Sequence, residues 1–370
     1  MRIGVPTEVK PDEFRVAATP AGVRELTSLG HQVLIQAGAG TGSRLPDAEY
    51  VAAGATVVAA ADDVWAEAEL VLKVKEPIEE EYHRLRRGQT LFTYLHLAAS
   101  RACTDALVAS GTTAIAYETV QAPDGSLPLL APMSEVAGRM APQVAAHFLE
   151  QYAGGRGILL GGVPGVRPAK VLILGAGTSG MSAALIALGL QADVTLLDKN
   201  VARLREADRV FGGAVTTVAS TVHEVEQAAI ESDVVIGAVL IPGAKAPVLI
   251  TDEIVAGMRP GAVLVDIAVD QGGCFESTHP TTHQHPVFSV GQTLFYCVAN
   301  MPGAVPLTST LALTNVTLPY VERLANLGTK AAVESDLALH GGVNVVGGAI
   351  THRGVADAFG LPFTEVADVL

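Results

Sequence analysis

The chain has 370 residues, 49% of them hydrophobic and 17% charged, so it is long enough for two cores and too apolar to be disordered. A formal net charge of −14 would repel nucleic acid and anionic membranes, and we expect neither as a partner. Cys103, Cys274 and Cys297 are too widely spaced for a disulfide framework or a zinc knuckle. With no secretory leader at the N-terminus, these features predict a cytoplasmic enzyme.

Short apolar segments alternate with helical patterns over the first 120 residues. Thr19 and Pro20 are typical of the N-cap and first position of a helix, which we expect to end at Gly30. Strands are expected at 3–5, 31–36, 56–59, 70–74, 90–94 and 113–116. This alternation predicts an α/β domain with a mostly parallel sheet.

A second α/β unit is expected after a boundary near residue 130. A helix containing Pro142 is predicted over 134–151, and a glycine-rich connector follows at 154–168. Further strands are expected at 171–174, 192–197, around Val215, at 233–237 and at 262–266. The uncharged stretch 291–320 is expected to form a buried strand and a loop that lead into a connecting helix at 309–317. The tail, 328–370, is predicted to be helical and to return to the first domain. The fold class is therefore two Rossmann-like α/β domains with mostly parallel sheets flanked by helices.

A dinucleotide fingerprint follows the apolar segment 171–174. Gly175 allows a tight turn, Gly177 lets the backbone approach a pyrophosphate, and Gly180 lets the next helix pack on the strand. Thr178 and Ser179 begin that helix, whose N-terminal amides face the anion. The uncharged stretch 171–192 is long enough to span a bilayer, but its glycines favour a strand, a turn and a helix instead. A glycine-rich turn without a ligand is the alternative.

The next apolar segment, 192–197, ends in Asp198. A carboxylate in this place accepts hydrogen bonds from the hydroxyls of an adenosine ribose, which favours NAD over NADP. The sequence therefore predicts that the second unit binds NAD.

Candidate chemical groups follow three predicted strands, where ligands of open α/β sheets bind. Lys75 has the charge to polarise a carbonyl oxygen, His96 has an imidazole that can serve as an acid or a base, and Asp270 has the carboxylate to orient a water or an amine. Arg15 is a candidate fork for a carboxylate. Taken singly, each has an ordinary alternative: Arg15 as a loop arginine, the neighbouring Lys73 as a strand-end surface charge, and His96 as a hydrogen-bonded core histidine.

Two other polar clusters receive no catalytic role. His279, His283 and His285 invite a metal interpretation, but the flanking prolines and the lack of a carboxylate or cysteine partner favour a polar surface loop, so we expect no metal. Residues 79–81 are three consecutive glutamates, which we interpret as the solvated start of a helix.

With these residues in view, the chain closely resembles the NAD-dependent L-alanine dehydrogenases over nearly its whole length. The resemblance rests on the motifs at 13–17, 73–77, 94–100, 116–120, 132–138, 161–165, 237–247, 266–276 and 296–306. It implies reversible oxidative deamination of L-alanine by NAD to pyruvate and ammonium, in a homohexamer with an active-site cleft between the domains. It also implies a substrate domain of residues 1–128 and 307–370 and an NAD-binding domain of residues 129–306.

The resemblance further assigns roles to individual residues. Arg15 and Lys75 hold the substrate, His96 is the acid/base, and Asp270 supports the attack of water on the iminium intermediate. Asp198 holds the adenosine ribose. The remaining implied cofactor-binding residues are Met133, Ser134, Gly175, Gly177, Thr178, Ser179, Gly180, Arg203, Ser220, Val239, Leu240, Ile267, Asp270, Val298, Asn300 and Met301.

Two other functions remain open on the same fold. The NAD-binding part of a proton-translocating transhydrogenase shares the segment 15–20 and needs no substrate acid/base, but the segments around Lys75 and His96 depart from its usual residues. A non-catalytic NAD-binding protein would be expected to lose Lys75, His96 or Asp270, and all three are present.

Overall fold

The computed structural model describes residues 1–239 and 246–370, which divide into two compact units. Unit 1 consists of Met1–Met133 and Val305–Leu370, and unit 2 consists of Ser134–Ala304. Each unit contains one sheet with helices on both faces, so the predicted fold class is confirmed. Among the described residues, no helix combines the length and the apolar character needed to cross a bilayer.

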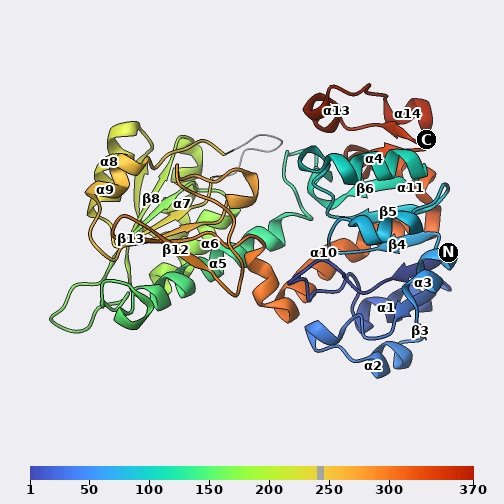
Figure 1. The fold of residues 1–370 in the computed structure, drawn as a ribbon, viewed down its shortest axis with the longest axis horizontal. Coiled ribbons are helices and arrows are strands. Elements are labelled where there is room, and N and C mark those ends of the chain that lie inside the picture. Colours follow the sequence, from blue (N-terminus) through green and yellow to red (C-terminus); the bar gives the residue numbers. More distant parts are fainter. Residues whose placement is uncertain (240–245) are drawn as a thin grey trace. The chain divides into compact units, whose positions relative to one another are not determined.

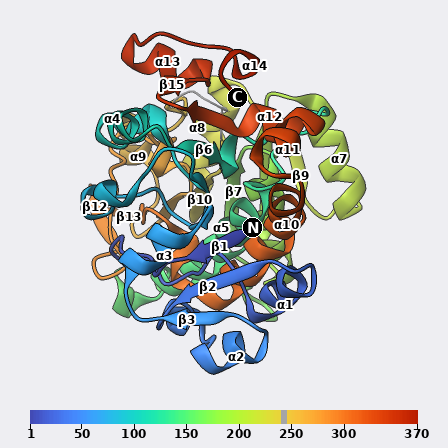
Figure 2. The same ribbon diagram turned by 90° about the vertical axis from the view of Figure 1, so that its right-hand side faces the viewer.

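The sheet of unit 1 has the order β15-β14-β6-β5-β4-β1-β2-β3 in the described residues. Neighbours from β3 to β6 are parallel, whereas β14 runs antiparallel to both β6 and β15. Figure 2 shows β1, β2 and β3 side by side. The strands are β1 (Arg2–Val5), β2 (Gln32–Gln36), β3 (Thr56–Val58), β4 (Leu70–Leu72), β5 (Thr90–Thr93), β6 (Thr113–Ala116), β14 (Val343–Val346) and β15 (Ala349–Ile350).

The helices of unit 1 follow the predicted βα alternation. The first is capped as the sequence predicted, since Thr19 Oγ1 accepts a hydrogen bond from the N–H of Gly22 at 3.2 Å and Pro20 occupies the first turn. The helices are α1 (Pro20–Ser28), α2 (Asp47–Ala52), α3 (Ala61–Glu67), α4 (Arg101–Ser110), α10 (Pro306–Leu327), α11 (Thr329–Ser335), α12 (Leu337–Gly342), α13 (Arg353–Phe359) and α14 (Val366–Val369).

The tail is not wholly helical, which corrects the prediction for residues 328–370. Its segment 343–350 forms β14 and β15, and β14 extends the sheet beyond β6. Three of the four residues of β14 are valines, whose β-branched side chains favour a strand once a sheet edge is available. Asn344, the fourth, is buried. Its amide tolerates burial because it donates to Thr119 Oγ1 at 2.8 Å and to the carbonyl of Gly342 at 2.9 Å.

The sheet of unit 2 has the order β12-β13-β11-β10-β7-β8-β9 in the described residues, and only the β12–β13 pair is antiparallel there. Its strands are β7 (Lys170–Leu174), β8 (Asp193–Asp198), β9 (Thr216–Ala219), β10 (Val234–Gly237), β11 (Val263–Asp266), β12 (Val287–Val290) and β13 (Thr293–Tyr296). Its helices are α5 (Ala131–Phe148), α6 (Thr178–Gly189), α7 (Val201–Phe211), α8 (Val222–Glu231) and α9 (Asp252–Gly257).

The continuous apolar runs of unit 2 arise because both faces of its sheet are covered. Val171 and Ile173 pack in one cluster with residues of α5, α6 and α7, and Leu172 and Leu174 pack in a second cluster with residues of α8 and α9. Figure 1 shows these helices around β8, β12 and β13 of the same sheet. The stretch 171–192 therefore forms β7, a turn and α6 rather than a single long helix.

Candidate active site

The glycine turn after β7 has the geometry that the fingerprint predicts. Gly175 has φ +102°, and its N–H donates to the carbonyl of Leu197 at 2.7 Å. A Cβ built on Gly180 would lie 1.7 Å from the carbonyl oxygen of Gly175. The first glycine is therefore required by the turn, and the third by the close approach of α6 to it.

Gly177 is different, because the protein itself does not require a glycine there. Its φ is −82°, and the nearest described atom to a Cβ built at this position is Arg203 Nη1, 3.9 Å away. A side chain at this position, immediately before the first turn of α6, would therefore extend into nearly open space. This opening fits a pyrophosphate group at a helix N-terminus.

Asp198 is tied to the glycine turn at the end of β8. Its Oδ2 atom accepts from the N–H of Ala176 at 2.7 Å, and its Oδ1 atom accepts from the N–H of Asn200 at 2.7 Å. The guanidinium of Arg203 lies 3.9 Å from Oδ2, and the N–H of Ser220 donates to the Asp198 carbonyl at 3.0 Å. These contacts bring Asp198, Arg203 and Ser220 to the same edge of the sheet as the turn.

The other predicted cofactor-binding residues of unit 2 surround two neighbouring strand ends. Val239 Cγ2 would be 3.1 Å from a Cβ on Gly175, and the N–H of Ile267 donates to the carbonyl of Gly237 at 3.0 Å. Asn300 donates its N–H to Asp270 Oδ2 at 3.4 Å, and Val298 and Met301 are buried in the core. Ser134 lies on α5. Leu240 lies outside the described residues.

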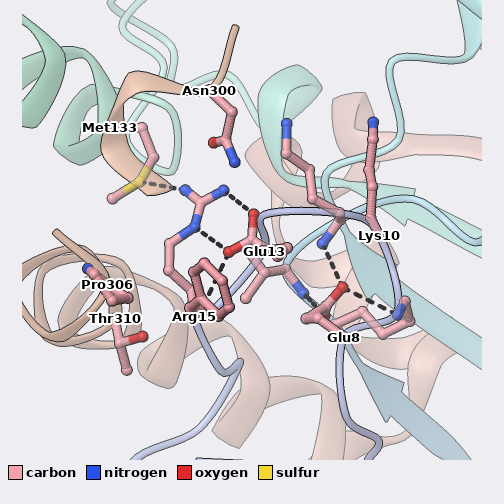
Figure 3. Close-up of polar contacts among 12 residues, drawn as sticks. Glu8, Lys10, Glu13, Arg15, Met133, Asn300, Pro306 and Thr310 are labelled. Atoms are coloured by element: carbon pink, nitrogen blue, oxygen red, sulfur yellow. Dashed lines mark hydrogen bonds and ion pairs between the residues drawn. The ribbon is translucent and has the colours of Figure 1, made fainter. Parts of the chain in front are cut away.

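In unit 1, Arg15 is buried against a carboxylate that the sequence analysis did not single out. Its Nε atom donates to Glu13 Oε1 at 2.7 Å, and its Nη2 atom bonds to Glu13 Oε2. Its Nη1 atom lies 2.9 Å from the sulfur of Met133, and Figure 3 shows Glu13 and Met133 around the guanidinium. Burial alone would raise the pKa of Glu13, but the hydrogen bonds and charge of Arg15, together with the charge of Lys75, lower it below its usual range.

Lys73 is not a surface charge, which corrects that alternative. Its side chain is 1% exposed, and its Nζ atom lies 3.1 Å from Glu8 Oε2 and 2.9 Å from Glu81 Oε1. Glu81 is itself 1% exposed, so the interpretation of residues 79–81 as a solvated helix start is wrong for its third member. The segment Glu79–Arg84 is a 3₁₀ helix, which turns Glu81 toward the lysine.

Glu8 links this ion cluster to Lys75. Its Oε1 atom accepts from the N–H of Val74 at 2.6 Å, and its Oε2 atom accepts from the N–H of Lys75 at 3.3 Å. Thr93 Oγ1 donates to the carbonyl of Lys75 at 3.1 Å, so both backbone groups of Lys75 are fixed. Burial raises the pKa of Glu8 although the charge of Lys73 opposes this. Lys75 itself is half-buried.

His96 is at the surface of unit 1, with 41% of its side chain exposed, so the core-histidine alternative is wrong. Its backbone is left-handed, with φ 48° and ψ 38°, a conformation uncommon outside glycine. Glu118 holds it there: Oε1 accepts from the N–H of His96 at 2.6 Å and lies 4.0 Å from Nδ1. The ring of Tyr94 stacks on His96 with centroids 6.0 Å apart.

Unit 1 thus brings Arg15, Lys75 and His96 to the carboxyl ends of β1, β4 and β5, and the sequence analysis missed the acids that hold them. Glu8 and Glu118 follow β1 and β6 just as Lys75 follows β4. Applying the strand-end rule to acids as well as to bases would have found both. Glu13 stands two residues before Arg15, and its proximity in sequence was the available signal.

The histidines of the 279–285 segment make separate contacts. The ring of His279 lies on Phe288, with centroids 3.8 Å apart, and His283 Nε2 lies 3.3 Å from the carbonyl of Asn300. In the described part of the chain, no three histidine, cysteine, aspartate or glutamate side chains come close enough together to hold a metal ion.

Comparison with known proteins agrees with this geometry. Residues 4–137 match the model of the N-terminal domain of alanine dehydrogenase/PNT, and residues 141–353 match that of the C-terminal domain. The chain is 63% identical to an alanine dehydrogenase from Mycobacterium tuberculosis, with 100% of both chains covered. A solved L-alanine dehydrogenase structure is 52% identical, with a TM-score of 0.94 over 97% of this chain and 99% of the other.

A solved transhydrogenase from Sinorhizobium meliloti is also similar, with 28% identity and a TM-score of 0.81 over 95% of this chain and 99% of the other. The two family models cover both units, and the full-length relatives agree with the resemblance found in the sequence. The chain belongs to the alanine dehydrogenase/PNT family.

Proposed function

We propose that the chain catalyses the reversible, NAD-dependent oxidative deamination of L-alanine to pyruvate and ammonium. The observation that carries this proposal is the set of strand-end groups in unit 1: a buried arginine, a lysine with a fixed backbone and an exposed histidine held by a glutamate. A protein that only binds NAD has no need of these groups. The high identity to alanine dehydrogenases over the full length supports the same function.

Each group has a role that its surroundings support. The guanidinium of Arg15, oriented by Glu13, and the ammonium of Lys75 bind the carboxylate and the carbonyl oxygen of the substrate. His96 removes a proton from the water that attacks the substrate iminium, and it returns a proton in the reverse direction. Asp270 stabilises that cationic intermediate.

The residues of unit 2 fit NAD. The turn at Gly175–Gly180 and the first amides of α6 would hold the pyrophosphate, and Asp198 would hold the adenosine ribose. Bound NAD supplies the acceptor for the hydride that leaves the alanine Cα. Met133, Ser134, Arg203, Ser220, Val239, Leu240, Ile267, Val298, Asn300 and Met301 are the further cofactor-binding residues that we propose.

The decisive experiment is an assay of NADH oxidation by the purified chain with pyruvate and ammonium. We expect rapid oxidation that requires both, and the same assay with other oxoacids such as glyoxylate measures the breadth of substrates. Oxidation no faster than with NADH alone would overturn the proposal and would favour the transhydrogenase subunit or a non-catalytic NAD-binding protein.

Variants of the proposed acid/base residues test the mechanism. His96→Ala should remove most of the turnover and leave NADH binding intact, and Asp270→Asn should also remove most of the turnover. His83→Ala is the matched control, because His83 is an exposed histidine of the same unit with 65% of its side chain accessible. A fully active His96→Ala variant would show that another group carries the proton.

We further propose that unit 1 is the substrate domain, unit 2 is the NAD-binding domain, and the enzyme is a cytoplasmic homohexamer. Free Cys103, Cys274 and Cys297 support a reducing compartment. Tyr152, Leu159, Val163 and Val166 of unit 2 are large exposed apolar side chains, whose burial would favour self-association. Light scattering should give six times the chain mass of 38.1 kDa, and a monomer mass would exclude the hexamer.

A further inference from the structure

Asp266, the last residue of β11, is a buried carboxylate with no role in the reaction described above. Its exposed fraction is 0%. Its Oδ1 atom accepts from the N–H of Ala268 at 3.0 Å, and its Oδ2 atom accepts from the N–H of Cys274 at 2.8 Å. These two amides lie near the beginning and at the end of the loop 267–274. One carboxylate therefore closes the loop that carries Asp270.

The loop is built tightly around this carboxylate. Asp270 is the middle residue of a 3₁₀ turn over Val269–Gln271, and the N–H groups of Gln271 and Gly273 donate to the carbonyl of Ala268 at 2.8 and 3.1 Å. Gly273 has φ +75°, and a Cβ built on it would lie 2.6 Å from Asp266 Oδ2 and 2.0 Å from Thr278 Cγ2. No side chain fits between the loop and the carboxylate.

Asp266 is held by hydrogen-bond donors rather than by a cation. Within residues 1–239 and 246–370, no ion pair involves Asp266. Burial raises its pKa to about 6, although the N–H groups of Cys274, Ala268 and Phe275 and the hydroxyl of Thr278 oppose that rise. The thiols of Cys274 and Cys297 are the titratable groups that face it, and burial raises the pKa of each to about 12.

An unpaired buried carboxylate costs free energy, and an asparagine of the same shape would avoid that cost. The amide of asparagine, however, has one acceptor oxygen, and its NH₂ group would face the second backbone donor. Only the carboxylate accepts from both ends of the loop at once. An acid at position 266 is therefore favoured because it binds both ends of the loop.

We propose that Asp266 is the positioning residue for Asp270, acting through the two ends of the loop 267–274. This inference rests on the proposed function, in which Asp270 stabilises the cationic intermediate. It predicts that the effect of Asp266 on turnover passes through Asp270.

A double-mutant cycle tests this path. Asp266→Asn should lower kcat about 10- to 100-fold in the otherwise unchanged enzyme and less than about 3-fold when Asp270→Asn is already present. The KM for pyruvate should change little in both backgrounds. Equal losses in the two backgrounds would mean a general structural role and would overturn the proposal.

Asp233→Asn is the matched control. Asp233 is a buried aspartate that immediately precedes β10, where it accepts from the N–H of Lys170 at 2.9 Å and pairs with Arg156 and Arg259. It therefore lies at the opposite end of the same sheet. Asp233→Asn should lower stability, and any effect on kcat should be the same with and without Asp270→Asn. Thr278→Val, which removes one donor to Asp266, provides a milder variant if Asp266→Asn folds poorly.

Hydrogen exchange of the loop separates this inference from the proposed function. Amides of 267–274 should exchange faster in Asp266→Asn than in the unchanged chain, and at an unchanged rate in Asp233→Asn. An unchanged rate in Asp266→Asn would overturn the positioning role whatever the enzyme catalyses. Faster exchange in a protein without alanine dehydrogenase activity would contradict the proposed reaction but would still support the contact between Asp266 and the loop.

Discussion

The Oδ2 atom of Asp198 accepts a hydrogen bond from the N–H of Ala176 at 2.7 Å, so the acid at the end of β8 and the glycine turn after β7 form one structure. A ribose bound by this acid would be fixed relative to a pyrophosphate bound by the turn. Discrimination between NAD and NADP should therefore depend on the same carboxylate that supports the turn.

Asp198→Ala should weaken NADH binding roughly 10- to 100-fold, because hydrogen bonds to a charged acceptor are lost. It should also reduce the preference of the protein for NADH over NADPH. Fluorescence titration with both reduced cofactors measures these effects. Asp193→Ala, at the exposed beginning of the same strand, removes the same charge and should change neither affinity. Unchanged cofactor preference in Asp198→Ala would exclude the ribose contact.

Two glycines of the turn should respond differently to the same substitution. Gly180→Ala places a methyl group 1.7 Å from the Gly175 carbonyl, so we expect a loss of about 3 kcal/mol or more in the free energy of unfolding. Gly177→Ala has no such clash, and it should keep normal stability while losing most NADH affinity. Urea unfolding and NADH titration of both variants provide the comparison. A Gly177→Ala variant that binds NADH normally would place the pyrophosphate elsewhere.

The buried lysine of unit 1 should be far more important for stability than a surface lysine. Lys73→Met leaves Glu8 and Glu81 buried without their cation, and breaking such a pair costs about 3–5 kcal/mol. Lys170→Met removes an exposed pair with Glu231 and should change the free energy of unfolding far less. Urea unfolding of the two variants tests this ranking. Similar losses in both would contradict the burial of the cluster.

The free energy of unfolding should depend on pH through the titration of Asp266. Its pKa of about 6 in the folded chain exceeds its ordinary value of 3.8, so its stabilising contribution is complete below about pH 4 and is lost as the pH rises through 6. Between pH 7 and pH 5, the free energy of unfolding of the unchanged chain should rise by roughly 1 kcal/mol relative to that of Asp266→Asn. Urea unfolding at pH 5, 6 and 7 measures that gain. A constant difference between the two proteins would mean that Asp266 does not titrate in this range.

Much of the fold could be predicted because its signals are local. The strand β7 is apolar at every position after Lys170 since each face of the sheet is covered, and that pattern is visible without any partner. The strand β14 gives no comparable signal. Its pairing with β6 joins residues more than 200 positions apart, and the short valine segment becomes a strand only at that edge.

The candidate site divides in the same way. Arg15, Lys75 and His96 could be proposed from their positions after strands, whereas their partners could not. The burial of Lys73 depends on Glu8, 65 residues away, and a run of three glutamates gives no sign that Glu81 alone turns inward. A charge run is usually solvated, and tertiary contacts decide which member is not.

The order of strands is repeated in the two units: β3-β2-β1-β4-β5-β6 in the first corresponds to β9-β8-β7-β10-β11-β13 in the second. In each, the chain reverses its direction of winding next to the first strand, and the segment leaving that strand carries the distinctive chemistry. The same strand order therefore supports two different kinds of binding group. In the first unit, the segment after β1 carries the charged side chains of Glu8, Glu13 and Arg15. In the second unit, the segment after β7 exposes backbone at Gly175 and Gly177.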